Sequence, residues 1–510
     1  MVELQDTIHT VRPMVKATAI KYVSAFRNQF SKEHLAALTP LLIHHLSSPS
    51  VVVHTYAASA IERFLICKER DGNGVMKNKF GGPEIQPFLQ QLFTALFSIL
   101  DNTSLNENEY VMKCVMRSLN ACREDVIPIT HIVLEKLNSA LFIVAKNPRN
   151  PSYNHYLFES IAVLVKSVCT KNPECTAAFE AMLFPPFQLV LQMDVSEFTP
   201  YIFQILAQIL EFRSDGLGDA YKVLFPPCLS PSLWDRKGNI PALTRLLEAY
   251  LQKGASEIVA LGHLIGLLGV FQKLISVKAD EMYGFDLLKS VIQFIPEDAF
   301  QPHMRGVVQI LLMRLQHSKS PRFVRLITTF FAQYVAKMGA LAYMDMMNSI
   351  QHGLGYMLLA QIWAPRLKSD IPVRTEAKVH VIALTHLLCQ VPDLLTDVKF
   401  LESWSQLLVC VIHMISSPNT KFDVDTLDEG DVVEIGYDPT FCRLHFAVRA
   451  YSDPFAEIKD PVLYFSQSLH TLCSSQPGKI VQLIQSVFNE DPKLSLALES
   501  IMKRSGLQLV

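Results

Sequence analysis

The sequence is poor in charge, and its few charges nearly cancel. Charged residues make up 18% of the 510 residues, and the formal net charge is −2. A protein whose main partner is nucleic acid needs a basic excess to offset the phosphates. The composition therefore argues against nucleic acid as the main partner. Apolar residues, at 50%, are ample for a large buried core.

Cysteine pairs of the kind that bind zinc are missing. None of the ten cysteines forms a Cys-x-x-Cys pair, and most lie within apolar helical runs. Such a pattern is typical of reduced, buried thiols in an intracellular protein. His380 and His386 are six residues apart, a poor spacing for one helical face, and Val75 interrupts a calcium-like opening at Asp71. We therefore expect no metal and no cofactor.

Long apolar runs are missing too. The longest, Ile258 to Phe271, is shorter than the roughly 20 residues that a membrane span needs. Met1 to Pro13 carries charges among scattered apolar residues and has no continuous apolar core, so it does not resemble a secretory signal. The sequence predicts no membrane insertion, and we expect residues 258–271 to form one buried helix.

Motifs of the common enzyme classes are absent as well. The sequence contains no Gly-x-Gly-x-x-Gly, no Walker loop, no Gly-x-Ser-x-Gly and no His-Glu-x-x-His. These motifs hold phosphates, nucleophiles or metal ligands in a fixed geometry. We therefore predict no catalytic residues and expect that the protein is not an enzyme.

What the sequence does contain is a series of amphipathic helices, clearest between Glu109 and Cys169. Three helices are predicted there, and the third begins near Tyr153. Their apolar residues recur on a 3.6-residue period, which places them on one face of each helix. The first stripe is Val111, Met112, Val115, Met116 and Leu119; the second is Ile129, Ile132, Val133, Leu137, Ala140, Leu141 and Val144; the third is Leu157, Ile161, Leu164, Val165 and Val168. One such hairpin cannot bury its stripes alone and needs similar hairpins on each side.

Helical pairs of this kind recur along the chain. Their first helices are predicted to start near residues 17, 50, 107, 153, 199, 239, 283, 321 and 373. The mean spacing is about 44–45 residues, inside the ~40–47 window of HEAT and armadillo repeats, and two helices per unit favour HEAT. The predicted fold over residues 1–510 is therefore all-α, a right-handed α-solenoid of about ten HEAT-type helical hairpins. No strand is predicted, residues 341–363 are expected to form one helix, residues 441–475 further short helices, and Pro185-Pro186 is expected to break a helix.

An acidic loop is predicted at 418–440, inserted between helices. Its carboxylates are Asp423, Asp425, Asp428, Glu429, Asp431 and Glu434, and no basic residue follows Lys421 in this stretch. Such a cluster can steer a basic partner and raise its association rate. The alternative is a solubilising surface insertion.

Two further groups of residues are candidates for partner contact because they interrupt the apolar stripes. Trp234, Arg236 and Lys237 lie between two predicted units. Lys319, Arg322 and Arg325 begin another. A solenoid presents a long surface suited to wrapping another folded protein. The alternative for each group is a solvated face or a helix cap.

Several polar strings resemble a known family. They are Ile20-Lys21-Tyr22 with Phe26-Arg27-Asn28-Gln29, Val52 to Ala58, Asn108 to Lys113 with Met116-Arg117-Ser118, Asn154-His155-Tyr156 with Phe158-Glu159, Gly238 to Leu243, and Leu267 to Ile275. In this order they resemble the C-terminal half of the CAS/CSE exportins, the importin-α re-exporters of the importin-β/karyopherin superfamily. The resemblance covers nearly the whole chain.

The resemblance implies a function that the repeat spacing does not. A protein of this family binds importin-α together with Ran-GTP in the nucleus, passes nuclear pore proteins, and releases both partners when the GTP is hydrolysed. It shuttles between nucleus and cytoplasm through the nuclear envelope and is not a catalyst. Positive coupling between two ligands suits a flexible solenoid, because ordering by one lowers the cost for the other.

One departure from the family affects the expected affinity. The N-terminal arch, with its first Ran-binding repeats, has no counterpart among these residues, so we expect this chain alone to bind Ran-GTP weakly. A HEAT-repeat scaffold subunit of another protein complex is the alternative. It would share the fold but not the polar strings.

Overall fold

The computed structural model describes residues 2–5, 12–102, 107–418, 420, 422, 441–448, 453–488 and 491–509. Within them the fold is all-α apart from one small hairpin, as predicted. The chain divides into two compact units. The first comprises Met1–Lys253 with Glu429–Arg449, and the second comprises Gly254–Asp428 with Ala450–Val510.

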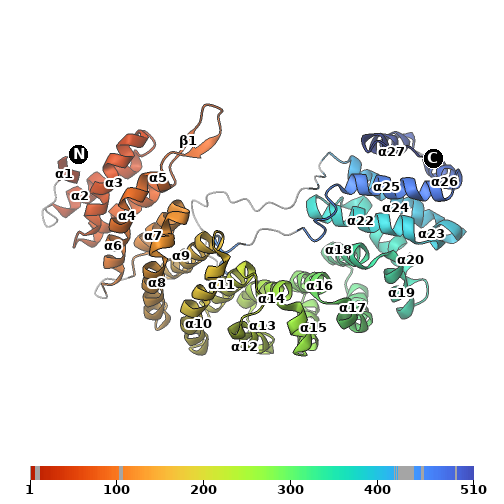
Figure 1. Ribbon diagram of the computed structural model, residues 1–510, viewed down its shortest axis with the longest axis horizontal. Helices are drawn as coiled ribbons and strands as arrows, with labels where there is room; N and C mark the ends of the chain where they lie inside the picture. The colour runs from red at the N-terminus through yellow and green to blue at the C-terminus, as the bar shows by residue number, and fades with distance from the viewer. Residues whose placement is uncertain are drawn as a thin grey trace. The chain divides into compact units, whose positions relative to one another are not determined.

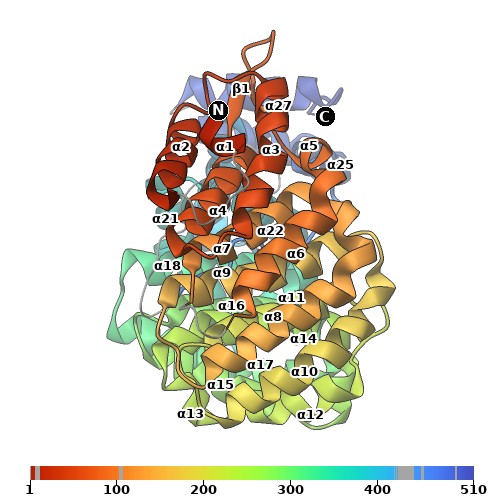
Figure 2. The same ribbon diagram turned by 90° about the vertical axis from the view of Figure 1, so that its left-hand side faces the viewer.

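The first unit stacks its helices in two layers. In chain order its elements are α1 (Val2–Gln5), α2 (Pro13–Ala25), α3 (Lys32–Leu46), α4 (Val51–Leu65), β1 (Lys68–Arg70), β2 (Met76–Asn78), α5 (Gly82–Ile85), η1 (Gln86–Phe88), α6 (Leu89–Leu100), α7 (Glu109–Cys122), η2 (Arg123–Ile129), α8 (Thr130–Ala145), α9 (Pro151–Cys169), η3 (Pro173–Cys175), α10 (Thr176–Gln192), α11 (Thr199–Phe212), α12 (Asp219–Cys228), α13 (Pro231–Trp234), η4 (Lys237–Asn239) and the start of α14 (Ile240–Ala260). One layer runs α2, α4, α7, α9, α11, and the other runs α3, α6, α8, α10. Both can be followed in Figure 1 and Figure 2.

The second unit repeats this arrangement. After α14 its elements are α15 (Leu264–Ser276), α16 (Glu281–Phe294), α17 (Glu297–His317), α18 (Pro321–Met338), α19 (Ala340–Ile350), α20 (Leu354–Leu358), η5 (Leu359–Trp363), α21 (Ala364–Ser369), α22 (Arg374–Gln390), α23 (Asp393–Thr396), α24 (Val398–Ser416), α25 (Pro461–Ser475), α26 (Lys479–Phe488) and α27 (Pro492–Arg504). One layer runs α16, α18, α22, α25, and the other contains α15, α17 and α19.

The hairpin of α7 and α8 with α9 shows why the sequence folds this way. Asn108 and Asn150 cap α7 and α9, because their side chains accept hydrogen bonds from main-chain N–H groups of the first turn. The three predicted stripes are the buried faces of these helices. Two residues of the second stripe are exceptions: Ile129 is only partly buried and ends η2, and Ile132 is 58% exposed because it lies on the other side of α8 from Val133 and Leu137.

Proline and glycine account for three errors in the predicted helices. α10 runs unbroken through Pro185 and Pro186, because burial of neighbours such as Phe187 offsets the lost main-chain hydrogen bonds. The apolar run 258–271 is two helices, since Gly262 turns the chain with a φ of 74°. Gly353, with the same φ, likewise divides the helix predicted at 341–363.

Two further segments differ from the prediction. The stretch around Asp71 is predicted as a loop, and residues 441–448 are predicted as helix. β1 and β2 pair antiparallel around a turn at Asp71 to Gly74. Every residue of the two strands is exposed, so the sequence here lacks the alternation of apolar and polar residues that predicts a strand. Residues 441–448 form no helix, and α25 begins only at Pro461.

Two stretches are long and apolar enough, by length and composition alone, to cross a membrane: Glu109–Ala145 and Val398–Ser416. The first is the α7–η2–α8 hairpin, which changes direction at η2. The second is α24, which packs against α22 and α27. Both belong to the helical layers.

Candidate protein-binding surface

Residues 442–447, the docked segment, lie on α9 and α11 in the first unit. Three helix side chains hold the main chain of this segment: Glu159 from α9, and Gln204 and Gln208 from α11. We call these three residues the docking site. Gln204 and Gln208 are four residues apart and share one face of α11. All three are at most 3% exposed.

The docking site recognises main-chain atoms. The amide of Gln204 donates to the carbonyl of Cys442 at 3.1 Å and accepts from the N–H of Leu444 at 2.8 Å. The carboxylate of Glu159 accepts from the N–H groups of His445 and of Phe446, the latter at 3.0 Å. Gln208 donates to the carbonyl of Phe446 at 3.1 Å. The side chains of Cys442, Leu444, Phe446 and Ala447 are buried, and that of Arg443 is exposed.

The electrostatics around Glu159 follow from its burial. Burial raises the pKa of Glu159 to about 7, against the two main-chain hydrogen bonds and the charge of Arg117, which favour the ionised form. His155 lies 3.6 Å from the Glu159 carboxylate, and burial lowers the pKa of His155 to about 4, so this ring is neutral at pH 7. His155 also bonds the Tyr201 hydroxyl at 3.1 Å, which joins α9 to α11.

A pocket of about 440 Å³ adjoins the docked segment at Phe441 and Cys442. Asn154, Tyr201 and Arg236 contribute to its lining. Asn154 is 4% exposed, and its side-chain oxygen has no hydrogen-bond partner among the described residues. Buried polar atoms are nearly always paired, so this oxygen marks a place where a donor is missing.

The predicted group at Trp234 divides into a structural residue and surface residues. Trp234 is 3% exposed, and its indole N–H donates to the carbonyl of Cys228 at 2.9 Å. Arg236 binds both carboxylate oxygens of Asp194, at 2.6 and 2.7 Å. Lys237 is exposed and makes no ion pair within the part of the chain that the structure describes. Lys237 is therefore the member best placed to meet a partner.

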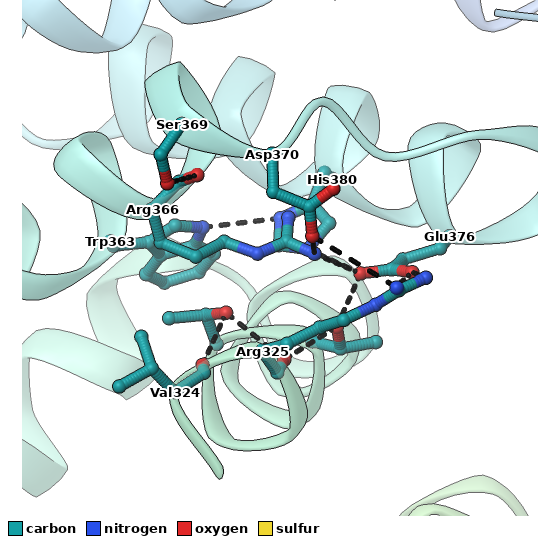
Figure 3. A network of polar contacts seen from close by, with 10 residues as sticks. Val324, Arg325, Trp363, Arg366, Ser369, Asp370, Glu376 and His380 are labelled. Carbon is teal, nitrogen blue, oxygen red and sulfur yellow. Dashed lines mark hydrogen bonds and ion pairs between the residues drawn. The ribbon is translucent and has the colours of Figure 1, made fainter. Parts of the chain in front are cut away.

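The predicted group at the start of α18 divides in the same way. Lys319 and Arg322 are exposed, and neither forms an ion pair with a described residue. Arg325 is tied to Glu376 of α22, with 3.0 Å between the guanidinium Nε and the carboxylate. The structure thus places Arg325 in a network between helices, drawn in Figure 3.

This network is partly buried. Arg366 of α21 donates to the same Glu376 carboxylate, which also accepts from the Thr329 hydroxyl at 2.9 Å. Burial would raise the pKa of Glu376, but the hydrogen bond from Arg325 and the charge of Arg366 hold it below its ordinary value. Burial lowers the pKa of the neighbouring His380 to about 3. The network joins α18, α21 and α22 and has a structural role.

The acidic residues predicted to steer a partner, Asp423 to Glu434, lie outside the described residues. Among the described residues, no group of three or more His, Cys, Asp or Glu side chains could hold a metal ion. The docking site was not anticipated from the sequence. The sequence feature that could have pointed to it is the presence of Glu159, Gln204 and Gln208 among the apolar residues of α9 and α11.

Stacked helix pairs in two layers define a helical-repeat protein of the solenoid class. Comparison with solved structures shows which helical-repeat proteins this chain resembles. The exportin Cse1 in its cargo-free, cytoplasmic state matches with a TM-score of 0.76 and 25% identity, covering 96% of this chain and 49% of that one. Importin β matches with a TM-score of 0.60 at 11% identity, which shows a shared HEAT-solenoid fold.

Sequence comparisons give the family. Residues 62–498 match the family model described as CAS/CSE protein, C-terminus, and residues 1–61 match the model described as Cse1. The chain belongs to the CAS/CSE family. Exportin-2 of Mus musculus is 37% identical over 486 residues, which are 94% of this chain and 49% of the mouse protein. Exportin-2 of Homo sapiens is 38% identical over 487 residues, with the same coverage. The chain spans about half the length of the curated relatives it matches.

Proposed function

We propose that this chain acts as the C-terminal part of a nuclear transport receptor that exports importin-α from nucleus to cytoplasm in complex with Ran-GTP. The observation that carries the proposal is the family match over residues 62–498, together with relatives named Exportin-2. The HEAT-solenoid fold supports it, because stacked helical repeats present long surfaces to folded partners. In this proposal the chain binds and releases proteins, is not an enzyme, shuttles through the nuclear envelope and contacts nuclear pore proteins.

Exposed cations without intramolecular partners are the residues we propose for partner contact. Lys237, Lys319 and Arg322 meet this description among the described residues. Charged residues at the edge of an interface raise association rates and set orientation. We propose that the negative charges of the acidic loop at 418–440 attract a basic surface of a partner.

Reconstitution with purified proteins tests the proposal. Importin-α and Ran, locked in its GTP or its GDP form, are mixed with this chain, and the complexes are separated by size-exclusion chromatography. We expect importin-α and Ran to co-elute with the chain only in the GTP form, and weakly. The complex should strengthen when the N-terminal half of mouse Exportin-2 is fused before residue 1.

Two results would contradict the proposal. Absence of importin-α from the complex with both the chain and the fusion protein would exclude the export function. Equal binding of the GTP and GDP forms of Ran would exclude coupling to nucleotide state. A scaffold subunit of another complex would give both results.

A further inference from the structure

The docking site has the properties of a peptide-binding site. It contacts main-chain atoms of four residues, Cys442, Leu444, His445 and Phe446, through side chains that belong to α9 and α11. Main-chain contacts do not depend on which side chains the peptide carries. Gln204 and Cys442 are 238 residues apart in sequence, so the segment reaches the site much as a separate peptide would.

The side chains of the docked segment add a simple requirement. Cys442, Leu444 and Phe446 are buried at alternate positions, at 6%, 0% and 6% exposed, while Arg443 between them is exposed. The site therefore holds apolar side chains at positions 442, 444 and 446 and a small one at 447, and it tolerates a polar residue at 443.

The site extends beyond the docked segment. The pocket of about 440 Å³ begins where Phe441 and Cys442 line it, and the buried oxygen of Asn154, another lining residue, has no donor among the described residues. Once the Asn154 amide rotates toward the pocket, a main-chain N–H of a longer peptide, extended at its N-terminal side, would supply that donor. Such an extended peptide would gain a hydrogen bond that the docked segment does not make.

We propose that the docking site and the adjoining pocket bind a non-helical peptide of another protein, with apolar side chains at alternate positions, and that the docked segment is an internal competitor for the same place. This inference does not depend on the proposed export function. A segment of the same chain competes as if it were present at a high local concentration. A peptide from a partner therefore binds well only if it also fills the pocket or if the internal segment is weakened.

Fluorescence anisotropy tests the proposal with labelled peptides. The first probe has the sequence of residues 441–448 with alanine in place of Cys442, which prevents oxidation. The second carries two additional N-terminal alanines that reach toward the pocket. The receptor is the full chain, either unchanged or with Leu444→Asp and Phe446→Asp, which disfavour burial of the internal segment. Arg443→Ala, at an exposed position, is the matched control.

We expect weak binding to the unchanged chain and to Arg443→Ala, and at least about tenfold tighter binding to the double variant, because the internal competitor has been removed. The longer probe should bind more tightly than the shorter one. Adding Asn154→Ala should remove only this advantage, whereas adding Gln204→Ala should weaken both probes by about tenfold or more. A probe with aspartate at the Leu444 and Phe446 positions should not bind.

Several results would overturn the proposal. One is the absence of saturable binding to a double variant whose melting temperature matches that of the unchanged chain. Another is binding that Gln204→Ala leaves intact. If the double variant does not fold, hydrogen exchange on the unchanged chain decides: an excess of the longer probe should speed exchange in residues 441–448, and unchanged exchange would refute competition.

Discussion

The carboxylate of Glu159 accepts a hydrogen bond from the main-chain N–H of Phe446, 287 residues further along the chain, at 3.0 Å. The contact excludes water from Glu159, which is 0% exposed. Because the same carboxylate accepts from the N–H of His445, it holds the docked segment at two adjacent positions. Its protonation state should therefore control how firmly the segment is held.

Docking of this segment should weaken as pH rises from about 5 to 7. The pKa of Glu159 is raised from 4.5 to about 7 by burial, so the docked state binds more protons over this range than the open state. By linkage, the free energy of opening then falls with rising pH, by at most about 3 kcal/mol in total, and levels off only above about pH 8. Hydrogen exchange of residues 441–448, corrected for intrinsic exchange rates, measures this free energy.

Glu159→Gln is the control for this titration. The nearby titratable group is His155, whose pKa of about 4 keeps it neutral over this range. The variant should therefore show no change in opening free energy between pH 5 and 7. An equal slope in both proteins would assign the effect to another group.

Glu376→Gln should destabilise the second unit by about 3–5 kcal/mol. The substitution leaves the buried guanidinium of Arg366 with only the more distant, exposed carboxylate of Asp370, and breaking one side of a buried ion pair is costly. Urea unfolding followed by circular dichroism measures the change. Asp370→Asn is the matched control, because Asp370 is 57% exposed and its loss should cost no more than about 1 kcal/mol. Similar losses from both substitutions would show that burial is not the cause.

Trp234→Ala should cost about 3–5 kcal/mol, since it removes a large buried side chain. Trp234→Phe keeps most of the apolar contact but leaves the carbonyl of Cys228 unpaired, which should cost about 1–3 kcal/mol. Lys237→Ala, three residues on and exposed, should change stability by no more than about 0.5 kcal/mol. Thermal unfolding of the three variants gives this order, and a tolerated Trp234→Ala would contradict the structural role.

Charge reversal at Lys319 and Arg322 should weaken binding of the proposed partners without loss of stability. Both side chains are exposed, so the substitutions break no ion pair with a described residue. Surface charges act mainly on association, so the association rate should fall and its dependence on salt should decrease. Biolayer interferometry with Ran-GTP and importin-α at two salt concentrations measures both. Unchanged rates at low salt would remove these residues from the proposed surface.

Gly82→Ala should destabilise the first unit by about 1–3 kcal/mol. A Cβ at this position would lie on the main-chain carbonyl of Ala121, which cannot move aside as a flexible side chain could. Gly269→Ala is the matched control. Gly269 lies within α15 with open space around it, so alanine there should stabilise by about 0.5–1 kcal/mol. Opposite signs in urea unfolding are expected, and a neutral Gly82→Ala would show that the backbone at α5 can shift.

Features that depend on residues close together in the sequence could be predicted. The stripes of α7 and α9 set both the helices and their buried faces, because positions three and four apart share one side of a helix. Repetition of such pairs was enough to predict the solenoid. Errors arose where packing overrode a local rule, as at Pro186, which lies buried inside α10.

The docking site could not be predicted in this way. Gln204 and its contact Leu444 are 240 residues apart, and the contact involves a main-chain atom that every residue type except proline carries. For the predicted surface residues, charge and approximate position could be predicted, but their partners could not. It could not separate Arg325, held by Glu376, from Arg322, which remains exposed.

Recognition through the main chain leaves the docked segment considerable freedom to diverge. Relatives could replace most of residues 442–447, provided that the alternate apolar positions keep their size and no proline removes a required N–H. The three helix residues that supply the polar contacts have no such latitude. Across the family, the constraint should therefore be stronger on Glu159, Gln204 and Gln208 than on the peptide they hold, so the signature of this attachment would be found in the receptor helices rather than in the segment itself.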